Sequence, residues 1–193
     1  MNSTGNNGTE TSAVPTLTVW CGPMIVGKTM ALIEDYRRMP INDRIAIKPT
    51  IDDRYSATSI VSHSGESIPA TSVNNLQNIE AIVGDIRNVY IDEGQFFMDL
   101  AEKCAALLLL GKSVRVAGLS ATAHQRPWQS MSDVMSMADI IVHLVGPECQ
   151  VCHRHPAAHT MFRSAAARVD PSVIRIGGGD VYVVVCRKCL WGM

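Results

Sequence analysis

The sequence has few aromatic residues, almost no net charge and no long apolar run. Its 17 Lys and Arg nearly balance its 18 Asp and Glu, so we expect no nucleic-acid partner. The longest apolar stretch, Cys104–Leu110, is far too short to span a bilayer, and no basic-then-apolar signal segment opens the chain. We therefore expect a cytoplasmic protein that has no membrane partner.

The apolar content fits a globular chain. Hydrophobic residues make up 47% of the 193 positions, enough for one packed domain with a small appendage. Residues 1–16 are small and polar, and we expect them to be disordered. Residues 17–146 are predicted to form the main domain, and 147–193 a small lobe that contains four of the six cysteines.

A glycine-rich stretch follows the first predicted strand. Residues Gly22–Thr29 read GPMIVGKT, which fits the pattern G-x-x-x-x-G-K-[ST]. The pattern lies between the apolar Leu17–Cys21 and a helical periodicity that stops at Pro40. In this order, loop and helix N–H groups wrap a phosphate. A glycine turn that binds nothing is the alternative, and the complete strand–loop–helix context favours a nucleotide site.

Predicted strands and helices then alternate along the chain. This order indicates an α/β fold in which helices cover both faces of a parallel sheet, with ligands at the carboxyl ends of the strands. Residues 51–67 are predicted to be either a loop that crosses the site or a weak hairpin. Further strands are expected at 44–50, 113–120 and 139–145, and within 88–97, where the strand ends in two carboxylates and a glycine. The helices are expected at 74–85, 99–111 and 126–138.

Two carboxylates end the strand NVYI. Asp92 occupies the position from which P-loop proteins hold Mg²⁺, together with the hydroxyl of Thr29. The adjacent Glu93 could take a proton from an attacking hydroxyl. A pair of solvated acids at a strand end is the alternative, and the glycine loop upstream argues against it.

The cysteines fall into two groups. Cys21 and Cys104 lie in apolar surroundings and are expected to be packed thiols. The other four form two C-x-x-C pairs with 33 residues between them, which favours one structural zinc site over two unrelated pairs or a redox site. The predicted zinc ligands are Cys149, Cys152, Cys186 and Cys189.

Six motifs carry a family resemblance. GPMIVGKT, DDRY, IDEGQFF, QRPW and IGGGDVY follow one another in this order, with one C-x-x-C pair on each side of IGGGDVY, and together they resemble the zinc-containing type II thymidine kinases of cells and poxviruses. The similarity extends from about Leu17 to Cys189. It implies a P-loop NTPase-like α/β fold, and phosphorylation of thymidine and deoxyuridine at the 5′-hydroxyl by ATP with Mg²⁺, in nucleotide salvage. It also implies a homotetramer.

The resemblance also implies roles for individual residues. Lys28 would contact the β- and γ-phosphates, and Glu93 would be the general base. Residues 173–177 would belong to a lid over the base, pinned at both ends by the zinc site. The implied ATP-binding residues are Gly22, Pro23, Met24, Ile25, Val26, Gly27, Lys28, Thr29, Asp52, Arg54, Asp92 and Gln95. The implied nucleoside-binding residues are Met24, Phe96, Leu119, Ala123, Val173, Ile174, Arg175, Ile176, Gly177 and Tyr182.

One stretch departs from the family pattern. In LSATAHQRPW, Ser120 replaces an aspartate, Ala123 a phenylalanine and Trp128 a phenylalanine. Ala123 is expected to enlarge the nucleoside pocket unless Trp128 fills the space. A kinase for another nucleoside is therefore the second hypothesis. A regulatory or interaction module without catalysis is the third, and the intact phosphate-site residues argue against it. For the lone His63 a structural role is favoured.

Overall fold

The centre of the molecule is a six-stranded parallel sheet. The computed structural model describes residues 14–52, 56–164 and 177–193. The strand order is β5-β2-β6-β7-β1-β8, and every neighbouring pair is parallel, as the sequence predicts. The strands are β1 (Leu17–Gly22), β2 (Arg44–Pro49), β5 (Thr71–Val73), β6 (Asn88–Ile91), β7 (Ser113–Leu119) and β8 (Ile140–His143).

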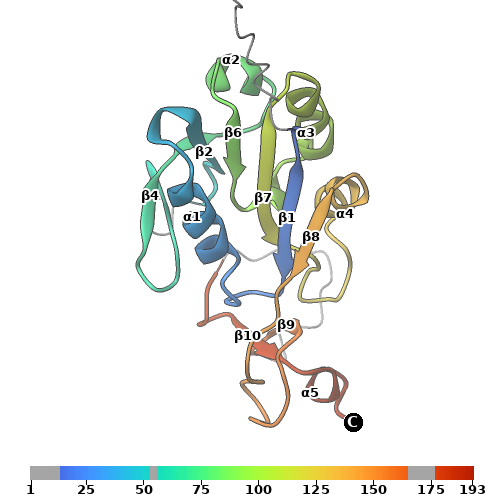
Figure 1. Ribbon diagram of the computed structural model, residues 1–193. Helices are drawn as coiled ribbons and strands as arrows, with labels where there is room; N and C mark the ends of the chain where they lie inside the picture. The colour runs from blue at the N-terminus through green and yellow to red at the C-terminus, as the bar shows by residue number, and fades with distance from the viewer. Residues whose placement is uncertain (1–13, 53–55, 165–176) are drawn as a thin grey trace, which may run out of the picture.

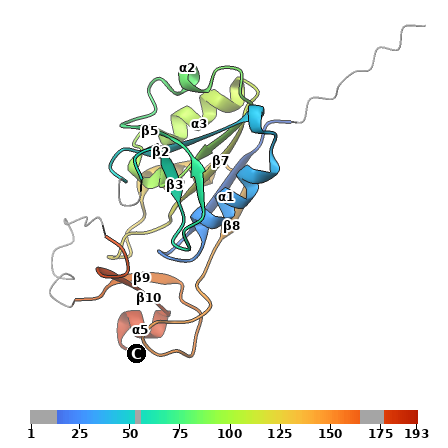
Figure 2. The ribbon, with the colours of Figure 1, turned by 90° about the vertical axis from the view of Figure 1, so that its left-hand side faces the viewer.

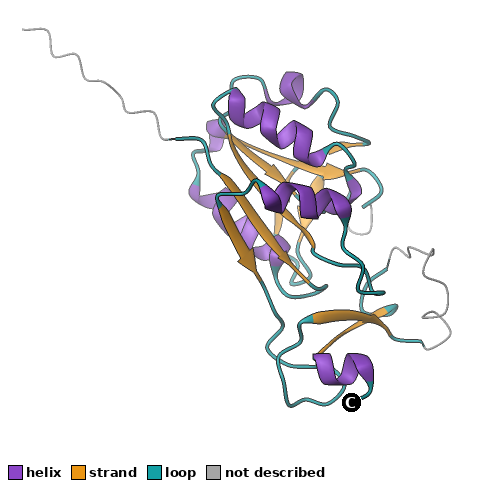
Figure 3. Cartoon of the chain, turned by 90° about the vertical axis from the view of Figure 1, so that its right-hand side faces the viewer, coloured by secondary structure: helices purple, strands orange, loops and turns teal. Residues whose placement is uncertain are grey.

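Helices cover both faces of this sheet (Figures 2 and 3). One face packs against α1 (Lys28–Arg38), and the other against α2 (Ile79–Val83), α3 (Leu100–Leu109) and α4 (Gln129–Ser136). Successive strand side chains point to opposite faces. In β6, for example, Val89 and Ile91 enter the core under α3, whereas Tyr90 enters the core under α1.

The segment before β5 forms a hairpin, which decides between the two expectations for residues 51–67. Strands β3 (Ser59–Val61) and β4 (Ser67–Pro69) pair antiparallel, with Ile60 opposite Ile68. Both isoleucines are buried in the core under α1, so the hairpin extends that layer. The short edge strand β5 was not predicted.

Two helices are shorter than the sequence predicts. Helix α2 has only five residues, because Leu76, before it, is held in a loop by a bond from its N–H to Asp99 Oδ2 (3.1 Å). The helix predicted from residue 126 begins at Gln129, and Pro127 instead pairs with Ala121 in an isolated bridge. Pro127 therefore precedes the helix rather than lying in its first turn. The remaining short turns are η1 (Ile41–Asp43) and η2 (Gly94–Phe96).

A small lobe follows the sheet. Strands β9 (His159–Phe162) and β10 (Tyr182–Val185) pair antiparallel, and α5 (Arg187–Trp191) follows them. The lobe has a separate cluster of buried side chains that includes Met161, Val183 and Val185. It lies beyond the carboxyl ends of the parallel strands (Figure 1). The glycine loop and Asp92 follow the carboxyl ends of β1 and β6. No helix in the described part of the chain is long and apolar enough to cross a bilayer.

Candidate active site and metal centre

The glycine loop connects β1 to α1 through a backbone that needs glycine at both ends. Gly22 has φ +146°, and a Cβ there would lie 2.3 Å from the carbonyl oxygen of Leu144. Gly27 has φ +91° and precedes α1, whose first backbone bond runs from Ala31 N to Gly27 O (2.9 Å). The first four N–H groups of an α-helix lack intrahelical partners and favour an anion. The loop therefore has the geometry of a phosphate site.

The sheet brings Thr29 and Asp92 together, although 62 residues separate them. The Thr29 hydroxyl lies 3.3 and 3.2 Å from the two carboxylate oxygens of Asp92. Asp92 is only 5% exposed, and burial, followed by the charge of Glu93, raises the pKa of its carboxyl to about 7. Carboxylate and hydroxyl oxygens are the ligands that Mg²⁺ prefers. This donor set fits a magnesium ion, whose charge would stabilise the buried carboxylate.

Glu93 lies in a constrained turn directly after Asp92. Its backbone is left-handed (φ 52°, ψ 41°), and η2 follows at once. Gly94 is required, because a Cβ there would lie 2.7 Å from Val116 Cγ1. The Glu93 carboxylate accepts a hydrogen bond from the side-chain amide of Gln95. Such unfavourable backbone conformations concentrate at functional sites.

One cavity of about 440 Å³ joins these groups to an apolar region. Its volume suits a small organic ligand. Gly22 and Pro23 are not among its lining residues, and Arg54, Val173, Ile174, Arg175 and Ile176 lie outside the described residues. The predicted site residues that line the cavity are Met24, Ile25, Val26, Gly27, Lys28, Thr29, Asp52, Asp92, Glu93, Gln95, Phe96, Leu119, Ala123, Gly177 and Tyr182.

Aromatic rings also line the cavity. The rings of Phe96 and Trp128 meet edge to face at 5.8 Å, and those of Phe162 and Tyr182 lie 5.0 Å apart. Trp128 therefore packs on Phe96, while Ala123 lines the same cavity. Flat apolar walls of this kind suit a planar base.

Ser120 in the departing stretch and His63 lie where the sequence did not predict them: position 120 was expected near the nucleoside pocket, and a structural role was favoured for His63. Ser120 is not among the residues that line the main cavity; it lines a smaller one of about 270 Å³, together with Pro23. His63, at the tip of the β3–β4 hairpin, lines the main cavity. Its position therefore allows ligand contact, which the favoured structural reading did not include.

The small lobe also contacts the glycine loop, through a residue that sequence reasoning missed. The N–H of Met24 donates to the hydroxyl of Thr160 in β9 (2.9 Å), and Gln125 Nε2 donates to the Thr160 carbonyl (2.9 Å). Thr160, His124 and Phe162 all line the cavity. No pattern in the sequence identifies them. Thr160 and Phe162 lie in β9, whereas His124 lies in the segment between β7 and α4.

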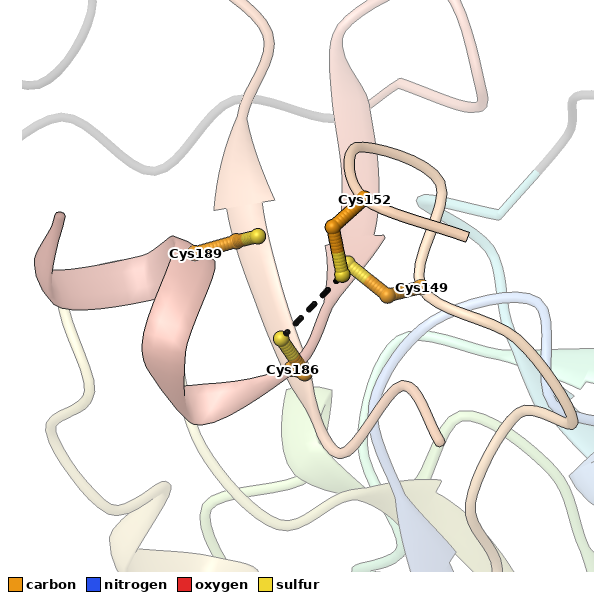
Figure 4. A group of neighbouring side chains, drawn as sticks. All are labelled: Cys149, Cys152, Cys186 and Cys189. Atoms are coloured by element: carbon orange, nitrogen blue, oxygen red, sulfur yellow. Dashed lines mark hydrogen bonds between the residues drawn. The ribbon is translucent and has the colours of Figure 1, made fainter. Parts of the chain in front are cut away.

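The four predicted cysteines converge in one cluster (Figure 4). Their sulfur atoms all lie within 4.8 Å of one another, with Cys152 Sγ 3.8 Å from Cys186 Sγ. This excludes the alternative of two unrelated pairs.

The thiol pKa values also suit a metal. Burial raises the pKa of Cys149, but the N–H groups of Cys152, Cys186 and Val151 lower it to about 6 overall. Burial and the neighbouring sulfur atoms raise the pKa of Cys189 to about 12. Zinc binds cysteines as thiolates, and four cysteines are a common ligand set for structural zinc.

Comparisons with known proteins agree with this geometry. The family model described as "Thymidine kinase" matches residues 15–190. A thymidine kinase of Raccoon poxvirus is 35% identical over 170 residues, which cover 87% of the chain and 92% of that protein. A thymidine kinase of Rhodothermus sp. (strain ITI 518) is 36% identical over 174 residues, which cover 89% of the chain and 79% of that protein. One of Vaccinia virus (strain Ankara) is 31% identical over 173 residues, which cover 89% of the chain and 94% of that protein.

Proposed function

Because the chain belongs to the type II thymidine kinase family, we propose that it transfers the γ-phosphoryl group of ATP to the 5′-hydroxyl of thymidine and of deoxyuridine. The observation that carries the proposal is one cavity that is lined by residues of the glycine loop, by two adjacent carboxylates and by aromatic rings. The product, a nucleoside monophosphate, serves nucleotide salvage.

The phosphate end provides positioning and charge. Lys28 and the loop amides hold the triphosphate beside Asp52. Thr29 and Asp92 would hold Mg²⁺, which would neutralise phosphate charge. Glu93 accepts the proton of the nucleoside 5′-hydroxyl while the hydroxyl oxygen attacks the γ-phosphorus. The bond between the γ-phosphorus and the oxygen that leaves with ADP then breaks. The rings of Phe96 and Tyr182, with Leu119 and Met24, hold the base and sugar.

The small lobe closes the nucleoside end. Four thiolates fill the coordination shell of zinc and leave no open catalytic position, so a zinc ion here would be structural. It would hold the lobe together. Gly177, which follows residues 173–176 in the sequence, lines the cavity. We propose that these four residues cover the base through main-chain groups. A covered site excludes water, which would otherwise compete with the nucleoside for the phosphoryl group.

An assay with γ-³²P-labelled ATP and a panel of nucleosides tests the function. We expect labelled monophosphate from thymidine and deoxyuridine, and much less from deoxycytidine and purine nucleosides. Preferential labelling of another nucleoside would favour the second hypothesis. ATP binding without transfer to any nucleoside would favour the non-catalytic module.

Ala123→Phe is expected to narrow nucleoside selection. The added ring would fill space in the cavity, because Trp128 already packs against Phe96. Hydrophobic pockets discriminate by about 1–3 kcal/mol per methylene-sized change, so preference for thymidine over a bulky 5-substituted analogue should rise about tens-fold at most. Competition assays on wild type and variant measure this ratio. An unchanged ratio would show that Ala123 does not contact the base.

We further propose a homotetramer. Strand β8 is an edge of the sheet, and its Ile140 and Ile141 are 51% and 50% exposed, so an apolar surface lies beside unpaired backbone groups. Light scattering should then give four times the chain mass of 21.0 kDa. A mass equal to one chain at assay concentration would contradict it.

A further inference from the structure

The side chain of Gln95 is buried and hydrogen-bonded at both ends. It is 2% exposed, although it lines the cavity. Its Nε2 donates to Oε2 of Glu93, and its Oε1 accepts the N–H of Leu119 at 2.9 Å. The amide therefore bridges the turn after β6 and the last residue of β7.

The orientation of this amide is determined by its partners. The N–H of Leu119 can only donate, so the oxygen of Gln95 must face it and the NH₂ group must face Glu93. The packing is close, since a Cβ on Gly118 would lie 2.8 Å from Gln95 Oε1. The backbone carbonyl of Gln95 also accepts a hydrogen bond from the buried Ser130 hydroxyl (3.1 Å). Backbone and side chain of Gln95 are thus both held.

We propose that Gln95 is a positioning residue for Glu93. Its amide fixes the carboxylate relative to the end of β7, where Leu119 forms part of the predicted nucleoside wall. A carboxylate has about four acceptor positions, so this bond is compatible with accepting a hydroxyl proton. The inference rests on the proposed base role of Glu93, and it assigns to Gln95 a function other than the ATP contact that the family resemblance implies.

The test begins with Gln95→Met, which keeps the length of the side chain and removes both hydrogen bonds. We expect kcat to fall about 10- to 100-fold, the usual cost of misplacing a catalytic group by about 1 Å. The KM for ATP should change less than about twofold, because the glycine loop is untouched. Gln129→Met is the matched control: this exposed glutamine on α4 bonds only Asp133 among the described residues, and its replacement should leave kcat unchanged.

A double-mutant cycle separates positioning from a general structural effect. If Gln95 acts through Glu93, Gln95→Met should lower kcat by less than about twofold further in a Glu93→Gln background. A full 10- to 100-fold loss in that background would overturn the inference and leave the base role intact. Near-normal turnover of Glu93→Gln alone would overturn both. A wild-type kcat in the single variant would overturn the inference alone.

A second variant covers the case in which Gln95→Met does not fold, as judged by its melting curve. Gln95→Leu has an apolar side chain of similar size and can neither accept the Leu119 N–H nor donate to the Glu93 carboxylate. The same loss of kcat is expected. Wild-type kcat in folded Gln95→Leu would overturn the inference.

Discussion

Replacing Glu93 by Gln is expected to lower kcat by about two to four orders of magnitude, the usual contribution of a general base. The amide has nearly the shape of the carboxylate, so the left-handed turn and the bond network around it should persist. Because the change affects proton transfer rather than binding, the KM values for ATP and thymidine should stay within a few-fold of wild type.

Steady-state kinetics with labelled ATP measure this loss. Glu102→Gln makes the same chemical change on the exposed side of α3 and should behave as wild type. Near-normal turnover in purified Glu93→Gln would contradict the base role. A large rise in the KM for ATP with unchanged kcat would instead place Glu93 among the binding residues.

Loss of the zinc site is expected to have the second large effect. Purified protein should contain about one zinc ion per chain, and Cys186→Ser or Cys152→Ser should lose it, because a structural site needs all four thiolates. The KM for thymidine should rise about tens-fold, since Phe162 and Tyr182 reach the cavity from the lobe. The KM for ATP should rise less, although the Thr160–Met24 bond transmits part of the change to the glycine loop.

Elemental analysis measures the zinc content of each variant, and steady-state kinetics measure the two KM values. Cys104→Ala is the control: this thiol is buried in the main core, so its loss should lower the melting temperature but preserve zinc and both KM values. Active, freshly prepared protein without any metal would contradict the zinc site. Equal effects on both KM values would show that the lobe supports the whole site rather than its nucleoside end.

The sequence by itself determined those features that depend on neighbouring residues. The glycine loop is a local pattern, because a phosphate turn, its lysine and its helix N-terminus lie within eight positions. Asp92 and Glu93 likewise follow from a strand that ends in two acids. The alternation of strands and helices was enough to predict the parallel sheet. The paired C-x-x-C spacing was enough to predict that the four cysteines meet.

Only the tertiary structure decided how segments distant in the chain share the cavity. Thr160 reaches the loop at Met24, 136 positions earlier, because β9 pairs with β10 and the lobe lies across the carboxyl ends of the sheet. The contacts of Gln95 and Trp128 likewise depend on how β6, β7 and the segment before α4 pack. Such contacts join residues that no local period or spacing relates, so their position follows from the packing of the whole fold.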